Sequence, residues 1–245
     1  MKIFDYFKKY ASPIEASSAC PDQPETTASA AEQPAAEEET VRVHNLLILD
    51  ESGSMQAIYN PALTGVNETL QTIRQAQAEH PRQEHFVTFV SFSTSHYKKL
   101  YHNTPADKTT DITSEQYSPS GGTPLFDTMG RAIEELRPMV KKNDVVLVTI
   151  ITDGYENASR EYNGPAIREL VKTLRKEGWV FTYIGANQDV EAVAESIAIN
   201  NRMAFSADER STREMFRKEK EARLQFACRV DMSRAKKDLE DNYFE

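Results

Sequence analysis

The 245-residue sequence has only two cysteines, no long apolar run and no excess of basic residues. Cys20 and Cys228 are far apart in the chain, so we expect no structural disulfide and a reducing compartment. No segment approaches the roughly 20 apolar residues of a transmembrane helix. Residues 1–10 are too short and too charged for the apolar region of a signal peptide. These absences favour a cytoplasmic protein.

The net charge of −9 argues against a nucleic-acid partner, because affinity for a phosphate backbone comes from basic patches. Three enzyme motifs are also missing: the phosphate-binding loop, the dinucleotide-binding glycine fingerprint and the nucleophile elbow. The sequence therefore favours a protein that is not an enzyme.

Composition divides the chain into three parts. Residues 1–40 begin with a short amphipathic arm in residues 1–10, which either docks on a partner or a membrane surface or is a frayed terminus. Residues 11–40 contain seven acidic and no basic residues and almost no large apolar side chains, which is typical of a disordered linker. Residues 41–230 are predicted to form one domain, and residues 231–245 a C-terminal tail.

Strand and helix patterns alternate through the domain. The expected strands are 41–50, 84–93, 96–101, 144–152, 179–185 and 202–205. The expected helices are 61–79, 124–142, 164–177, 190–199 and 208–230. This alternation predicts an α/β fold with a doubly wound, mostly parallel sheet of about six strands and helices on both faces. Residues 96–101 follow their predecessor too closely for a crossover, so they should form a short antiparallel edge strand.

Oxygen-bearing side chains follow two of the apolar strands. Asp50, Ser52 and Ser54 come at the end of the first strand, Asp153 follows the strand 144–152, and Thr123 precedes a helix. In a doubly wound sheet these loops share one edge, where such folds bind their ligands. Five hard oxygen donors suit Mg²⁺, or Mn²⁺ in its place, rather than Zn²⁺.

Three motifs together resemble the von Willebrand factor type A (VWA) domain. They are Asp50-x-Ser52-x-Ser54, Gly121-Gly122-Thr123 and Thr152-Asp153-Gly154, in the order and on the element ends typical of that family. The resemblance, closest to bacterial intracellular members, implies a metal-ion-dependent adhesion site. The hydroxyls would bind the metal, and the two aspartates would bind it directly or through water. It further implies a partner protein that offers an Asp or Glu side chain to the metal, with ring-shaped ATPases as one class of partner, and a shift of the final helix on binding.

Taken singly, these residues have simpler interpretations. Ser52 and Asp153 could be helix N-caps and Thr123 a loop hydroxyl. The leading hypothesis is a metal-dependent protein-interaction module. The alternatives are a Mg²⁺-dependent phosphoester hydrolase, which lacks a His or Lys in the three loops to act as acid or base, and a metal-free adaptor. We expect Glu51, the loop with Glu156 and Asn157, and the charged face of the final helix to be solvated.

Overall fold

The computed structural model describes residues 40–186, 189–233, 239 and 242–244. Its six strands form one sheet in the order β3-β2-β1-β4-β5-β6, in which every pairing is parallel except that of β2 with β3. The fold class predicted from the sequence is confirmed. The strands are β1 (Val41–Asp50), β2 (Gln83–Ser93), β3 (His96–Pro105), β4 (Val145–Thr152), β5 (Trp179–Ala186) and β6 (Asn201–Phe205).

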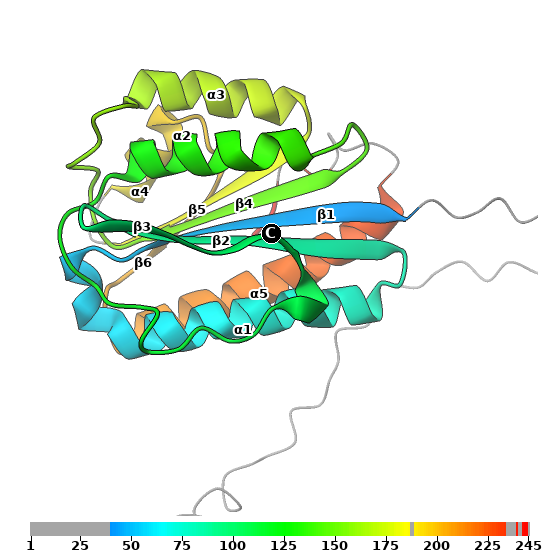
Figure 1. The fold of residues 1–245 in the computed structure, drawn as a ribbon, viewed down its shortest axis with the longest axis horizontal. Coiled ribbons are helices and arrows are strands. Elements are labelled where there is room, and N and C mark those ends of the chain that lie inside the picture. The colour runs from blue at the N-terminus through cyan, green and yellow to red at the C-terminus, as the bar shows by residue number, and fades with distance from the viewer. Residues whose placement is uncertain (1–39, 187–188, 234–238, 240–241, 245) are drawn as a thin grey trace, which may run out of the picture. The chain divides into compact units, whose positions relative to one another are not determined.

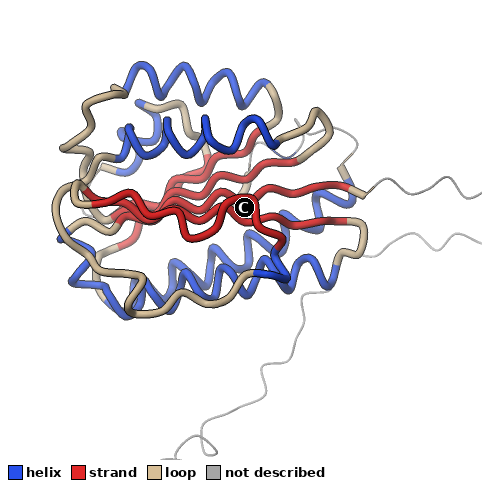
Figure 2. The backbone as a smooth tube through the Cα atoms, in the orientation of Figure 1, coloured by secondary structure: helices blue, strands red, loops and turns tan. Residues whose placement is uncertain are grey.

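Within the described residues, five α-helices cover the two faces of the sheet. Figures 1 and 2 show α1 and α5 on one face and α2, α3 and α4 on the other. No helix in the described part of the chain is long and apolar enough to span a bilayer. The helices are α1 (Tyr59–Glu79), α2 (Leu125–Leu136), α3 (Gly164–Lys176), α4 (Val190–Ser196) and α5 (Glu209–Met232), with single 3₁₀ turns at Gly53–Ile58, Ala106–Lys108 and Arg137–Met139.

The central strand β1 contributes side chains to the apolar layers on both faces of the sheet. Leu46 and Ile48 pack into the layer under α2 and α3, whereas Leu47 and Leu49 pack into the layer under α1 and α5. All four side chains are almost fully buried. Burying one such side chain stabilises the fold by about 1.5–3 kcal/mol, so this continuous apolar run belongs at the centre of the sheet. The only tryptophan, Trp179, is also in the core.

Two element lengths differ most from the prediction. Strand β3 is ten residues long, because its polar second half still pairs with β2 as far as the Phe86–Pro105 pair. Helix α2 ends at Leu136, earlier than predicted. Pro138 follows two residues later, and it has no amide hydrogen to donate to the carbonyl four residues before it. The chain therefore continues as a 3₁₀ turn.

Helix α5 is not the simple solvated face that its charged sequence indicated. Glu219 and Arg223 are buried and form an ion pair at 2.6 Å. Arg223 also donates hydrogen bonds to Asn45 on β1 and to Thr149 on β4, each shorter than 3.0 Å. Tyr243 donates a hydrogen bond of 3.2 Å to Glu219. This network joins α5 to the middle of the sheet and to the last described residues.

Several expectations concern the ends of the chain. The N-terminal arm and the acidic linker lie outside the described residues, apart from Thr40. Within the predicted C-terminal tail, Leu239 and Tyr243 are buried in an apolar cluster that also contains Val43. Cys228 is disulfide-bonded, so the expectation of unpaired cysteines is wrong, and cysteine content no longer argues for a reducing compartment. Cys20 lies outside the described residues.

Candidate metal centre

The sheet topology brings the three predicted motifs to one edge. Strands β1 and β4 are parallel neighbours with Leu49 opposite Ile151, so Asp50 and Asp153 leave the sheet side by side. The chain before α2 closes over the same edge, because the amide of Gly53 donates a hydrogen bond of 3.0 Å to the carbonyl of Gly121. Thr123 thereby reaches the two aspartates from a third loop.

The hydroxyls and carboxylates of these loops are in contact. The Ser54 hydroxyl donates a hydrogen bond of 2.6 Å to Asp153 Oδ1, and the hydroxyls of Ser52 and Ser54 lie 3.2 Å apart. Ser54 is exposed, whereas Asp153 and Ser52 are buried. The cluster therefore opens to solvent on the Ser54 side.

Gly154 marks the point on which the three loops converge. A Cβ atom built on this glycine would lie 3.3 Å from Thr123 Oγ1, 3.5 Å from Ser54 Oγ and 4.0 Å from Asp50 Oδ2. Together with the bonds of Ser52 and Asp153 to Ser54, this contact brings all five predicted ligands into one cluster.

The two carboxylates are buried without a cationic side chain among their hydrogen-bond donors. Burial raises the pKa of Asp50 to about 6, although it accepts hydrogen bonds from the Thr152 hydroxyl at 2.6 Å and from the Ser52 amide at 2.7 Å. Burial also raises the pKa of Asp153, against the opposing effect of the Ser54 hydrogen bond. Asp153 Oδ2 is buried and accepts no hydrogen bond from any described residue. The metal-free cluster therefore contains uncompensated negative charge.

This donor set fits Mg²⁺ or Mn²⁺. Carboxylate and hydroxyl oxygens are the ligands that these hard cations prefer, and a divalent ion would offset the two buried charges. The five candidate ligands include neither His nor Cys, the ligands typical of a zinc site, and the described residues contain no cluster of three His, Cys, Asp or Glu side chains that could hold a metal.

The expectation that Glu51 is solvated, which follows from strand alternation, is wrong. Glu51 is fully buried. Its carboxylate forms an ion pair with Lys98 at 2.7 Å, lies 2.8 Å from Nε2 of His96 and accepts a hydrogen bond from the Ser118 amide. His96 and Lys98 are two residues apart on a strand, so they share a face, which is the sequence signal that could have indicated an acidic partner.

The loop after Asp153 also makes hydrogen bonds that were not expected from the sequence. Asn157 is exposed, as predicted, yet its side-chain carbonyl accepts a hydrogen bond of 2.9 Å from the Thr123 amide. The half-buried carboxylate of Glu156 accepts a hydrogen bond of 2.9 Å from the Phe126 amide in the first turn of α2. The motifs of the sequence contain no sign of either contact.

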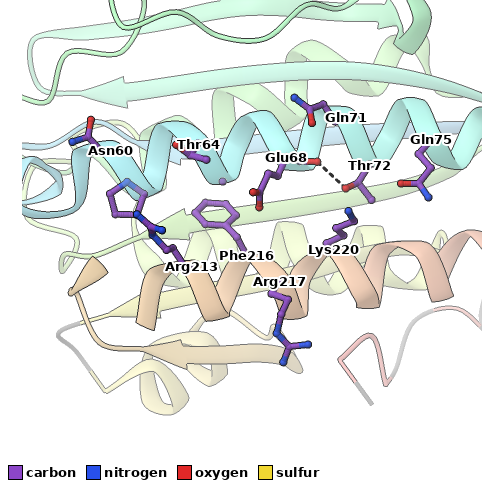
Figure 3. Close-up of a pocket in the computed structure, with 12 residues that line it drawn as sticks. Asn60, Thr64, Glu68, Gln71, Thr72, Gln75, Arg213, Phe216, Arg217 and Lys220 are labelled. Carbon is purple, nitrogen blue, oxygen red and sulfur yellow. Dashed lines mark hydrogen bonds between the residues drawn. The ribbon is translucent and has the colours of Figure 1, made fainter. Parts of the chain in front are cut away.

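A separate pocket lies between α1 and α5, and none of the five predicted ligands lines it. Figure 3 shows Phe216 of α5 directed toward α1, with Glu68 and Lys220 at the wall of the pocket. The two helices approach closely because Gly65 has no side chain. A Cβ atom built there would lie 2.0 Å from Cδ2 of Phe216. The pocket, of about 560 Å³, therefore belongs to the helix contact and not to the candidate metal centre.

Residues 46–218 match the family model of the von Willebrand factor type A domain. This span is longer than half of the chain. The chain belongs to this family. VWA domains are protein-interaction modules. Among curated proteins, none matches this chain.

Solved structures share the VWA fold at low sequence identity. The PilB minor pilin from Streptococcus sanguinis is similar with a TM-score of 0.53 and 14% identity, over 76% of this chain and 62% of that chain. Proximal thread matrix protein 1 from the mussel byssus has a TM-score of 0.51 and 20% identity, over 77% and 47% of the two chains. The pilus adhesin SpaC from Lactobacillus rhamnosus GG, in its open conformation, has a TM-score of 0.50 and 15% identity, over 76% and 30%. This chain thus spans less than two thirds of each.

Proposed function

We propose that this VWA domain binds a partner protein through a Mg²⁺ or Mn²⁺ ion held by Asp50, Ser52, Ser54, Thr123 and Asp153. The observation that carries the proposal is the unpartnered, buried Asp153 Oδ2 beside converging oxygens from three loops. Asp50 and Asp153 would balance the charge of the ion, and the three hydroxyls would contribute ligands without charge. When bound, such an ion offers a coordination position to an oxygen ligand from outside the domain.

Charge near the cluster favours an acidic ligand. With a divalent ion the two aspartates leave the centre close to neutral, so an approaching carboxylate is not repelled by them. The next acid in the chain, Glu51, is neutralised by Lys98 and is fully buried. We therefore propose a partner that offers an Asp or Glu side chain. Ring-shaped ATPases, implied by the sequence resemblance, are a partner class that the experiment below should include.

The same contacts disfavour the hydrolase alternative. Two basic residues at the start of β3 each place a side-chain nitrogen within 3 Å of a Glu51 oxygen: His96 at 2.8 Å and Lys98 at 2.7 Å. A general acid or base must reach the proton that it transfers, and these groups are already engaged. We propose that the domain is not an enzyme.

The test compares capture of partners by wild-type protein and two variants. Immobilised protein is incubated with cell extract in Mg²⁺ and in chelator, and captured proteins are identified by mass spectrometry. We expect capture in Mg²⁺ by wild type and by Asp107→Ala, whose side chain is 53% exposed and distant in sequence from the three loops. Capture should be lost with Asp50→Ala and with chelator.

Two results would change this conclusion. Capture that persists both in Asp50→Ala and in chelator would show that another surface binds the partner, as in the metal-free adaptor alternative. Turnover of a phosphoester by purified protein, lost in the same variant, would instead establish the hydrolase.

A further inference from the structure

The loop that follows Asp153 holds both backbone groups of Thr123. The Asn157 side-chain carbonyl accepts a hydrogen bond of 2.9 Å from the Thr123 amide. The amide of Asn157 in turn donates a hydrogen bond of 3.2 Å to the Thr123 carbonyl. Because Asn157 is only four residues beyond Asp153, it connects two of the proposed ligands that are 30 residues apart in the sequence.

Gly122 leaves the space that this contact needs. A Cβ atom built on Gly122 would lie 2.8 Å from Asn157 Oδ1 and 3.3 Å from Thr94 Cγ2. Its φ angle is not in the left-handed region, unlike that of Gly121, so the backbone here does not itself require glycine. The absence of a side chain at position 122 is therefore explained by the approach of Asn157 and Thr94.

The rest of the loop is attached independently of Asn157. Glu156 accepts hydrogen bonds from the amides of Phe126 and Ser159, at 2.9 and 2.7 Å. Asp127 accepts hydrogen bonds from the amides of residues 160–162, all between 2.8 and 2.9 Å. Removing the Asn157 side chain should therefore free the Thr123 amide while the remainder of the loop stays on the first turn of α2.

We propose that Asn157 is a positioning residue of the metal centre. Its hydrogen bonds hold the Thr123 backbone so that the Thr123 hydroxyl lies beside Gly154 and faces the oxygens of Ser54 and Asp50. The proposal rests on the proposed function, because it assigns a role at the same site. It adds a residue outside the three sequence motifs.

The experiment measures the affinity of purified protein for Mn²⁺ by electron paramagnetic resonance, and the exchange of the Thr123 amide by NMR. We expect Asn157→Ala to weaken Mn²⁺ binding about tenfold, the lower end of the effect of residues that support metal ligands. The lower end applies because Asn157 is exposed and water replaces part of the lost bond. The Thr123 amide should exchange faster even without metal.

Two comparisons separate positioning from general destabilisation. Gly122→Ala displaces the Asn157 side chain and should weaken Mn²⁺ binding to a similar degree. In a Thr123→Val background, which lacks the hydroxyl, Asn157→Ala should cause no further loss. Asp127→Asn loosens the distant end of the loop and should change Mn²⁺ affinity less than twofold, even if it lowers the urea midpoint.

The outcomes distinguish this proposal from the proposed function. If Asp50→Ala abolishes Mn²⁺ binding but Asn157→Ala leaves both affinity and Thr123 exchange unchanged, the metal centre stands and the role of Asn157 is refuted. Additive losses in the Thr123→Val background would also refute it. If wild-type protein binds no Mn²⁺, both proposals fail.

Discussion

Asp50→Asn tests whether the buried Asp50 carboxylate lowers the free energy of unfolding of the metal-free domain. The carboxylate of Asp50 is fully buried, and burial raises its pKa from 3.8 to about 6. A group whose pKa is raised by folding contributes stability below its unfolded pKa and loses it as the pH rises through the folded pKa. In the absence of metal, Asp50 should therefore destabilise the domain progressively between about pH 4 and pH 7.

The size of the effect follows from the two pKa values. The difference between 3.8 and about 6 corresponds to about 3 kcal/mol at a pH above both. Asparagine has nearly the same shape and does not ionise. Its amide can meet the Thr152 hydroxyl, which can accept as well as donate, and its carbonyl can accept from the Ser52 amide. Metal-free Asp50→Asn should thus be more stable than wild type by up to about 3 kcal/mol, or about 6–12 °C in Tm.

The assay is urea unfolding followed by the fluorescence of Trp179, the only tryptophan and a buried one. With chelator, the variant should gain stability at about pH 7.5 and little at about pH 4. With Mg²⁺ at a hundredfold excess over Kd, wild type should regain about 3 kcal/mol and the variant should gain much less. Asp107→Asn, an exposed control, should show neither effect. An advantage of Asp50→Asn that is equal at both pH values, or absent in chelator, would refute the reasoning.

Three further changes test the supports of the fold. Burial alone would raise the pKa of Glu51, but hydrogen bonds from Lys98 and other nearby donors outweigh burial and lower the pKa, so its stabilisation exists above the unfolded pKa and disappears on acidification. Urea midpoints measured from neutral to acidic pH should fall less steeply for Glu51→Gln than for wild type; equal slopes would contradict this. Arg223→Met leaves the buried Glu219 unpaired and should cost about 3–5 kcal/mol in urea unfolding, most of it recovered by adding Glu219→Leu. Gly65→Ala should destabilise by about 1–3 kcal/mol through its clash with Phe216, and a loss of the same size in a Phe216→Ala background would exclude that clash as the cause.

The fold could be predicted from the sequence because its determinants are local. The apolar run of β1 indicates a strand buried on both faces, and the structure places its residues in both layers. Gly178, two residues beyond α3, has a φ of 86°, a left-handed conformation that favours glycine and explains why the helix stops close to the predicted residue 177. The grouping of the five candidate ligands also follows from topology, since loops after parallel strands share an edge. Their occupancy by metal stays a prediction.

The supporting contacts could not be predicted, because their partners are distant in the sequence. Lys98 is 47 residues from Glu51, and Asn157 is 34 residues from Thr123. Arg223 reaches across 178 residues to Asn45. Strand alternation or helix periodicity decides which face a side chain occupies, but neither says what will lie opposite it. An acid or an arginine in a polar pattern is therefore assigned to solvent until tertiary structure supplies a buried partner.

The buried aspartates and the contacts around them have opposite effects on the stability of the metal-free domain. This contrast explains how the fold tolerates the candidate metal centre. Asp50 and Asp153 are buried without cationic donors, which opposes folding at neutral pH. The contacts around them favour the same arrangement: Glu51 forms an ion pair with Lys98, and the Thr123 backbone is held by Asn157. A site whose ligands are held in place by their neighbours does not have to reorganise when an ion arrives, so less binding energy is lost in ordering them. The rest of the fold thus offsets the destabilisation caused by the two buried aspartates, and a bound cation would remove that destabilisation.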